Sequence, residues 1–375
     1  MNKWGILFLQ LYFLYQLTSS PALALLLKTI RVGELLLLLM QLDSKITSTV
    51  PVSVLDLAAI LDGFTPGDTF RNSLDLAQQA EKWGYTRYWL AEHHNMASIA
   101  SSATVVLIGH IANGTSSIRV GSGGIMLPNH APLVVAEQFG TLASLYPGRI
   151  DLGLGRAPGT DPLTARALRR DGSNGTDFPQ QVQELQGYLS AANSANKVRA
   201  IPGEGLDIPV WLLGSSTYSA QLAGYLGLPF AFASHFAPTY LQAALEIYRS
   251  SFRPSAYLDK PYAAACVNVI AADSDEQAEH LATSFYQFAL NIIRGTSKPL
   301  QPPVSSMQGV WHELEEEAVR QMMTYSFIGG PQTVQNQLRY FLQVTQVDEL
   351  IAVSHIYDHT ARLRSYELLA SVSKW

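Results

Sequence analysis

From Val50 onward, the chain alternates short apolar runs with segments of helical periodicity. The intervals between the runs include Phe70–Gly84, Leu133–Leu145 and Thr239–Phe252, in which apolar residues recur at helical spacing. Eight strands with intervening helices favour a closed parallel barrel over an open sheet, so we predict an α/β protein with a (β/α)8 (TIM) barrel. The eight predicted strands are Val52–Leu57, Arg87–Ala91, Ile118–Gly121, Ile150–Gly155, Val210–Leu213, Phe230–Ala233, Tyr262–Ala271 and Glu349–Val353.

The connection between strands 7 and 8, about residues 273–347, is long. It contains two or three predicted helices around the proline-rich stretch Lys298–Val304. Such an insertion in a barrel is typical of a lid or a substrate-shaping segment, and equally of a packing or dimer element. We therefore predict a long insertion between strands 7 and 8 and leave its role open.

Residues 1–49 differ from the rest, and we predict an apolar N-terminal extension ahead of a barrel domain over residues 50–375. Trp4–Leu17 is apolar behind Lys3 and is followed by small residues, a loose match to a signal peptide. Leu35–Met40 is too short to span a bilayer, which needs about 20 apolar residues. A secretion signal, a membrane anchor, and extra residues ahead of an internal start such as Met40 all stay open.

Charge and cysteine content narrow the function classes. The formal net charge is −5 and no basic block or stripe stands out, so we expect no nucleic-acid partner. The single cysteine, Cys266, excludes an intramolecular disulfide framework and a cysteine-cluster metal site. It lies in an apolar run, so we interpret it as a buried small hydrophobic residue.

Active sites of such barrels lie at the carboxyl ends of the strands, and Glu92-His93-His94 follows the second strand. Adjacent residues of an extended segment point to opposite faces, so the two histidines do not easily share one metal ion. A metal would need a third ligand such as His235 or His355. We predict no metal, and an acid–base or cofactor-contact role for one histidine.

Further strand ends are rich in glycine and hydroxyl groups. Gly123 and Gly124 follow the third strand within a run that predicts an unusual backbone or a flat ligand pressed against it. Arg156 ends the fourth strand beside glycines, which suits a planar or anionic ligand. The loop Gly214–Ser219 precedes a helix, where its hydroxyls could bind a phosphate or simply cap the helix.

Taken together, four of these runs resemble the luciferase-like flavin monooxygenases, in the same order along residues 50–370. The runs are Tyr88–His94, Val120–Pro128, Gly148–Arg156 and Pro209–Ser219. The chain is most similar to an uncharacterised bacterial subgroup of that family. The resemblance implies reduced FMN delivered by a separate flavin reductase, O2 as co-substrate, and a flavin hydroperoxide that oxidises a small organic substrate. It also implies a monooxygenase acting on paired donors, a cytoplasmic location and a homodimer.

The resemblance assigns roles to particular residues. His93 and Glu92 match catalytic residues near the flavin, and Gly123 and Gly124 match a pair joined by a cis peptide beside the flavin ring. Arg156 matches an arginine that contacts the flavin and its phosphate. Gly214, Ser215, Ser216 and Ser219 match the phosphate-side loop.

This chain departs from the luciferases in two ways. Ser215 stands where they carry an acidic residue, and their reactive cysteine has no counterpart, since Cys266 lies on a later strand. A long-chain aldehyde is therefore not the expected substrate. Two alternatives stay open: a deazaflavin-dependent hydride-transfer enzyme, and a flavin-binding protein without turnover.

Overall fold

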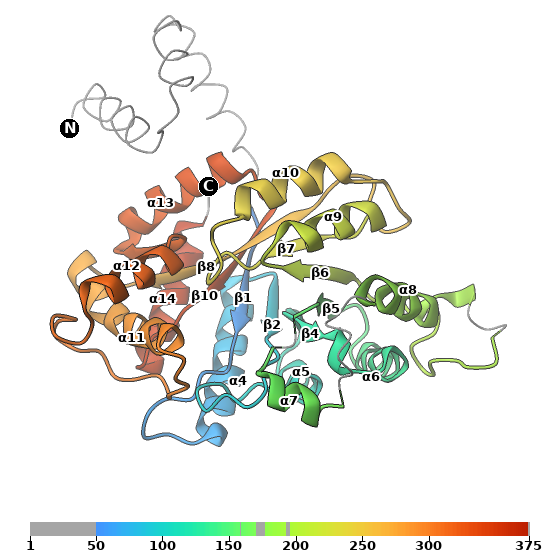
Figure 1. The fold of residues 1–375 in the computed structure, drawn as a ribbon, viewed down its shortest axis with the longest axis horizontal. Helices are drawn as coiled ribbons and strands as arrows, with labels where there is room; N and C mark the ends of the chain where they lie inside the picture. The colour runs from blue at the N-terminus through green and yellow to red at the C-terminus, as the bar shows by residue number, and fades with distance from the viewer. Residues whose placement is uncertain (1–49, 158, 170–176, 193–195, 374–375) are drawn as a thin grey trace, which may run out of the picture. The chain divides into compact units, whose positions relative to one another are not determined.

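A computed structural model describes residues 50–157, 159–169, 177–192 and 196–373, and these form the predicted barrel (Figure 1). Eight parallel strands pair in the order β10-β1-β2-β3-β5-β6-β7-β8, and a β10–β8 pairing closes the ring. The prediction of a (β/α)8 barrel is thus confirmed. The barrel strands are β1 (Val52–Asp56), β2 (Arg87–Leu90), β3 (Arg119–Ser122), β5 (Ile150–Gly155), β6 (Val210–Gly214), β7 (Phe230–Phe232), β8 (Ala263–Ala271) and β10 (Glu349–Val353).

Helices surround the strands (Figure 1). They are α4 (Pro66–Trp83), α5 (Thr104–Asn113), α6 (Pro132–Leu145), α7 (Pro162–Ala167), α8 (Phe178–Leu189), α9 (Thr217–Leu226), α10 (Leu241–Ser251), α11 (Asp275–Ile293), α12 (Glu313–Met322), α13 (Pro331–Thr345) and α14 (His359–Val372). Local signals define α4 clearly. Thr65 and Asp68 form a capping box at its start, Pro66 occupies the first turn, and Gly84 ends it in the left-handed conformation.

The predicted strands and helices agree with the observed ones to within a few residues, but five elements were not predicted. These are β4 (Ile125–Met126), the 3-10 turn Leu127–Asn129, the helix α7, β9 (Ser326–Gly329) and the C-terminal helix α14. Two of them are strands of two and four residues, too short for a periodic pattern to develop.

The strand β8 is shared between the barrel and the insertion. Residues Ala263 to Asn268 pair with β7, with β10 or with both, and the last four residues, Asn268 to Ala271, pair with β9. The insertion therefore consists of α11, α12, β9 and α13, and β9 attaches it to the barrel by parallel strand pairing.

The core of the barrel has two apolar layers. Between strands and helices, buried residues such as Leu76, Phe139 and Tyr248 fill the space. Inside the barrel, a smaller cluster contains Trp89 and Trp211, whose rings meet edge to face at 5.1 Å. These interior side chains come from alternate strand positions, as the two-residue period of a strand requires.

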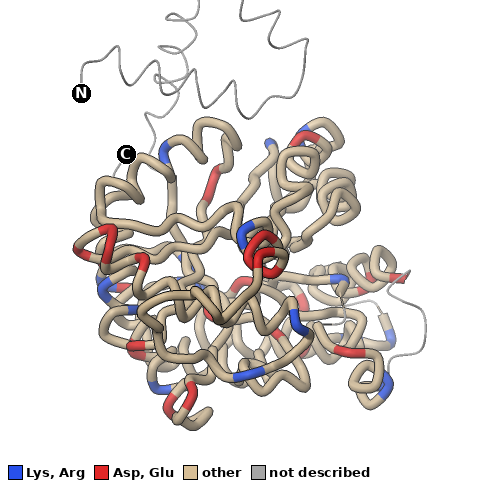
Figure 2. Tube along the Cα trace, turned by 60° about the vertical axis from the view of Figure 1, so that its left-hand side comes forward, with Lys and Arg blue, Asp and Glu red and all other residues tan. Residues whose placement is uncertain are grey.

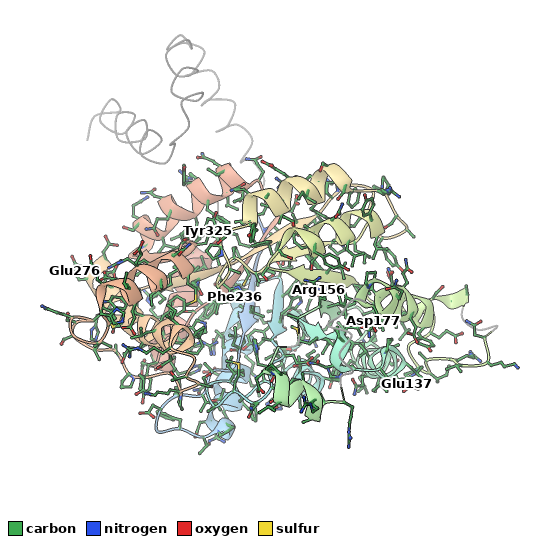
Figure 3. The ribbon with its side chains drawn as sticks, viewed as in Figure 1. Glu137, Arg156, Asp177, Phe236, Glu276 and Tyr325 are labelled. Atoms are coloured by element: carbon green, nitrogen blue, oxygen red, sulfur yellow. The ribbon has the colours of Figure 1, made fainter. Side chains whose placement is uncertain are left out.

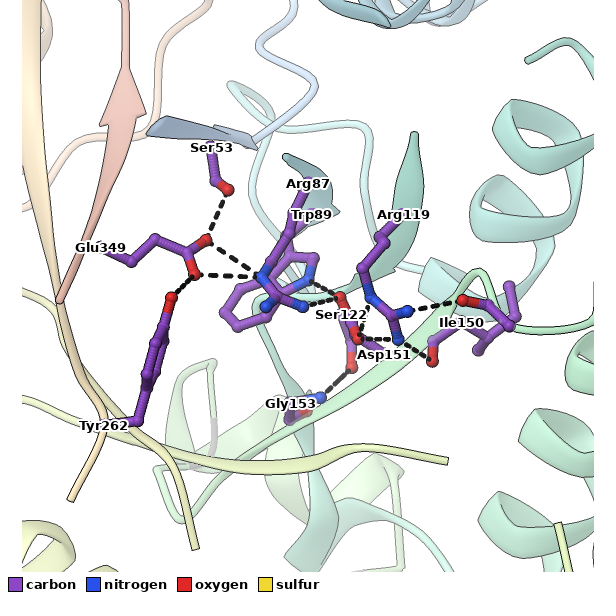
Figure 4. A network of polar contacts seen from close by, with 11 residues as sticks. Ser53, Arg87, Trp89, Arg119, Ser122, Ile150, Asp151, Gly153, Tyr262 and Glu349 are labelled. Carbon is purple, nitrogen blue, oxygen red and sulfur yellow. Dashed lines mark hydrogen bonds and ion pairs between the residues drawn. The ribbon is translucent and has the colours of Figure 1, made fainter. Parts of the chain in front are cut away.

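Ion pairs close the amino-terminal end of the barrel (Figure 4). The Arg87 guanidinium lies 2.7 Å from Asp151 and 3.0 Å from Glu349, and both carboxylates are fully buried. Arg119 also pairs with Asp151 at 2.6 Å, and the Tyr262 hydroxyl donates to Glu349. Each buried charge thus has several partners, as burial of charge demands. The carboxyl-terminal end of the barrel is therefore the end at which a ligand can bind.

Acidic and basic residues are interspersed along the described trace (Figure 2). Among the helices of the described residues, none is long and apolar enough to span a bilayer. The predicted extension, residues 1–49, lies outside the described residues.

Candidate active site

A cavity of about 520 Å³ opens at the carboxyl ends of the barrel strands. Its wall includes the end of β2, the β3–β4 turn, the end of β5 and the β6–α9 connection. In Figure 3, Arg156 and Phe236, both on this wall, lie toward the middle of the view. Eight of the nine predicted site residues line the cavity: His93, Gly123, Gly124, Arg156, Gly214, Ser215, Ser216 and Ser219.

The residues after β2 alternate in direction, as predicted. His93 lines the cavity, whereas neither Glu92 nor His94 does. Burial lowers the pKa of His93 below its usual value, against the opposing effects of the Gly159 carbonyl and Glu92. The imidazole is therefore neutral at neutral pH and can accept a proton from a group in the cavity.

Glu92 lies behind the cavity wall. Its Oε1 is 2.9 Å from Nε2 of both His94 and His130, and its Oε2 accepts from the Met126 N–H. Burial alone would raise the pKa of Glu92, but the bonds from His130, His94 and Met126 outweigh it and lower the pKa. Glu92 is thus an ionised anchor for Met126, which does line the cavity. Its catalytic role stays a prediction.

At Gly123 and Gly124 the cavity wall is bare backbone. The peptide between them is cis, as the resemblance implies. A Cβ atom on Gly123 would lie 2.6 Å from Leu55 Cδ1, and one on Gly124 would lie 2.6 Å from the Gly153 carbonyl oxygen. A side chain is therefore excluded at Gly124, where the contact is with backbone, whereas at Gly123 the Leu55 side chain would have to move. A flat ligand can approach the bare main chain here.

The Gly214–Ser219 connection offers hydrogen-bond donors. Ser216 is the N-cap residue of α9, yet its side chain makes no capping hydrogen bond. Within the described residues, no hydrogen bond is formed by the hydroxyls of Ser215, Ser216 or Ser219. Of the two interpretations of this loop, helix cap or anion site, the uncapped geometry favours the anion site, because the positive end of the helix dipole adds to the free donors.

Arg156 completes this donor set. Its guanidinium lies 4.2 Å from the Tyr218 ring centroid, a cation–π contact on the second residue of α9. No carboxylate of the described part of the chain pairs with it. The cation is therefore held near the start of α9 with its N–H donors available to an anion.

Sequence reasoning missed part of the cavity wall. Cys266 and Asn268 come from alternate positions of β8, so the strand period could have placed both in the barrel interior. His235 and His355 follow β7 and β10, but they were considered only as metal ligands. Among the described residues, no group of three or more potential ligands could hold a metal ion. The insertion adds wall residues that no sequence pattern indicated: Phe285, Phe288, Ile292 and Met322.

Burial keeps the additional titratable groups neutral. It lowers the pKa of His235 to about 3, with further lowering by His355 and His93. It also lowers the pKa of His355 to about 3, helped by Arg362. The pKa of the Cys266 thiol is raised well above its usual value by burial, so the thiol stays protonated and is not a nucleophile. The cavity thus combines unpaired hydrogen-bond donors near the start of α9, a wall of bare backbone, neutral histidines and an apolar compartment.

Comparison with known proteins agrees with this arrangement. The family model for luciferase-like monooxygenases matches residues 50–349. The chain is 54% identical to a luciferase-like monooxygenase of Escherichia coli (strain K12) over 327 residues, which cover 87% of this chain and 98% of that protein. It is 58% identical to the uncharacterised protein YvbT of Bacillus subtilis (strain 168) over 324 residues, 86% of this chain and 96% of that protein. The crystal structure of apo-MsnO8 superposes with a TM-score of 0.77 at 35% identity, covering 87% of this chain and 98% of that one.

Proposed function

The chain belongs to the luciferase-like monooxygenase family, and from that premise we propose that it is a flavin-dependent monooxygenase that uses reduced FMN and O2 to oxidise a small organic substrate. The observation that carries the proposal is the pairing of two features in one cavity. Unused donors surround the start of α9, and a bare backbone wall lies at Gly123–Gly124.

The donor set fits FMN. Arg156, Ser215, Ser216, Ser219 and the first N–H groups of α9 would hold a phosphate, because they combine charge, hydroxyl donors and a helix terminus. The isoalloxazine would lie against Gly123 and Gly124, where no side chain interferes. Reduced FMN, when bound, would supply the electrons that activate O2 for transfer of one oxygen atom to the substrate.

The protein's own residues then act on protons and water. His93, neutral and facing the cavity, accepts a proton from the reacting groups. Glu92 acts as a positioning residue, since it holds the Met126 N–H at 3.0 Å behind the wall. The apolar wall, including Leu55, Trp89 and Leu213, excludes bulk water. Under this proposal a separate reductase supplies reduced FMN in the cytoplasm, and the enzyme acts as a homodimer.

The test compares three ligands and one reaction. The protein should bind FMN more tightly than riboflavin, which lacks the phosphate, and more tightly than a deazaflavin. When photoreduced FMN is mixed with air, the protein should change the rate of flavin reoxidation. Absence of FMN binding, or preference for deazaflavin, would contradict the proposal. FMN binding without any effect on reoxidation would indicate a flavin-binding protein without turnover.

A further inference from the structure

One side of the cavity is built differently from the anion site. It is formed by the residues after β7 and β10, by β8, and by α11 and α12 of the insertion. Its wall is mostly apolar, and its polar groups are the histidines and one amide. Its residues are Phe236, Phe285, Phe288, Ile292, Met322, His235, His355 and Asn268.

The Asn268 side chain is fixed in one orientation. Its Nδ2 donates to the His235 carbonyl oxygen at 2.6 Å and to Ser326 Oγ at 3.1 Å. Exchange of the amide nitrogen and oxygen would place Oδ1 against that carbonyl, acceptor against acceptor. Oδ1 is therefore an acceptor, and it is buried with no partner among the described residues.

His235 contributes a second unpaired atom to this side of the cavity. The residue is only 9% exposed, so water does not readily reach its Nδ1. This buried atom has no hydrogen-bond partner within the described part of the chain. The ring meets Phe236 edge to face at 4.8 Å. A neutral imidazole nitrogen can donate or accept, depending on the tautomer.

Charge limits which ligand this side can take. Arg156 is the only Lys, Arg, Asp or Glu among the described residues that line the cavity, and it belongs to the anion site at the start of α9. A carboxylate beside Asn268 would meet an acceptor and no cation, which makes its burial unfavourable. Aromatic side chains such as Phe285 and Phe288 favour an apolar or aromatic ligand body.

We propose that this side of the cavity binds the substrate, a neutral and largely apolar molecule with one hydroxyl that donates to Asn268 Oδ1 and accepts from His235 Nδ1–H. This inference rests on the proposed function, because it takes the cavity as the active site. It concerns binding only. Leaving the two buried atoms unpaired costs free energy, so a ligand that lacks the donor binds more weakly.

A matched series of probes tests the proposal: benzyl alcohol, benzyl methyl ether, toluene and benzoate. Calorimetry is performed on the FMN-loaded protein and on the cofactor-free protein. Benzyl alcohol should bind about tenfold or more tightly than the ether or toluene, the equivalent of one unpaired buried group. Equal binding of alcohol and ether, or tighter binding of benzoate, would overturn the proposal.

Two variants locate the effect, and a third serves as a matched control. Asn268→Ala should reduce the alcohol-to-ether preference about tenfold, because it removes the acceptor that only the alcohol can use. His235→Phe should weaken the alcohol and the ether alike, about tenfold, because the oxygen of each accepts from Nδ1–H. FMN affinity should stay unchanged in both variants. Ser284→Ala removes another buried, unpaired hydroxyl that does not line the cavity, and it should leave the binding of both probes intact. If Asn268→Ala keeps the wild-type preference, or His235→Phe binds both probes as the wild type does, the assignment is wrong.

The two proposals fail separately. If the wild-type protein does not bind FMN, the proposed function fails, while the probes on the cofactor-free protein still decide the preference for alcohol. If FMN binds and the alcohol shows no advantage, only the substrate inference fails.

Discussion

The Nε2 atom of His94 lies 2.9 Å from Oε1 of Glu92, outside the cavity that His93 lines. Of these three consecutive residues, His93 therefore faces the cavity, whereas Glu92 and His94 contact each other behind its wall.

His93→Gln should slow the protein-dependent reaction with O2 about a hundredfold, the low end for loss of a general base. Because burial lowers the pKa of His93, the wild-type rate should decline only below the usual histidine range. The measurement is a pH profile of FMN reoxidation. His94→Gln is the control and should keep the profile; the assignment of the base is wrong if the two variants behave alike.

Arg156→Met tests the anion site. Loss of a charge-assisted hydrogen bond costs about 1.5–3 kcal/mol, so FMN affinity should fall roughly tenfold to a hundredfold. Riboflavin affinity should hardly change, since it has no phosphate. Fluorescence titration measures both. Arg199→Met, which removes an exposed arginine paired with Glu204, should affect neither ligand. An equal loss for FMN and riboflavin would argue against phosphate recognition by Arg156.

Gly124→Ala tests the bare backbone wall. The added Cβ would lie 2.6 Å from the Gly153 carbonyl oxygen, so we expect a loss of about 1–3 kcal/mol in the free energy of unfolding and weaker FMN binding. The matched control is Gly187→Ala in α8, where the new methyl group meets nothing within 4 Å. It should stabilise the protein by about 0.5–1 kcal/mol. Urea unfolding measures both, and a stable Gly124→Ala variant with normal FMN affinity would contradict the close approach.

His355 makes stability depend on pH. Its pKa is about 3 in the folded protein and near 6.5 when unfolded, so the unfolded state binds more protons between these values. Stability should therefore be full above about pH 6.5 and fall as pH drops, by about 1.4 kcal/mol per pH unit for this histidine. His355→Phe retains the stacking on Phe285 and Phe288 but cannot titrate. Urea unfolding between pH 7 and pH 5 should show a shallower slope for the variant; identical slopes would mean that His355 is protonated in the folded protein.

Arg87→Leu tests the closure of the amino-terminal end of the barrel. The change leaves the buried Glu349 without its cation, whereas Asp151 keeps Arg119. Breaking such a pair costs about 3–5 kcal/mol. Thermal and urea unfolding should report it, with Arg320→Leu, from an exposed pair on α12, as a control of little effect. A small effect of Arg87→Leu would show that the network is not needed for stability.

The barrel, and the cavity residues that lie at the carboxyl ends of strands, could be predicted because both can be located from the order of the strands along the chain. Each strand leaves signals of its own, and the carboxyl end of a strand is a fixed place in such a barrel. His93, Gly124 and Arg156 were found in this way. Asn268 and Cys266 lie within the apolar strand β8 and not at its end, so a search of the strand ends does not find them. Phe285 and Met322 reach the cavity from helices of the insertion, and only tertiary packing brings them there.

The hydrogen bonds of Glu92 were beyond sequence reasoning for a related reason. Its partner His130 is 38 residues away, beyond β4, a two-residue strand that sequence periodicity does not reveal. Without knowledge of that contact, the adjacent residues Glu92 and His93 are both predicted to be catalytic. The structure separates them by direction: one side chain enters the cavity and the other turns behind its wall.

The sharing of β8 between barrel and insertion bears on how the segment could be exchanged between relatives. An inserted loop can usually be cut out at its two ends. Here the strand β9 is hydrogen-bonded to Asn268–Ala271, and Asn268 also bonds Ser326 through its side chain. If the insertion were exchanged by cutting after β8 and before β10, β9 would be removed with it. The backbone of Asn268–Ala271 would then lose its paired strand. The segment that can be exchanged between relatives is therefore the stretch from α11 to α12 alone. The recipient keeps its own β9, paired with its own β8.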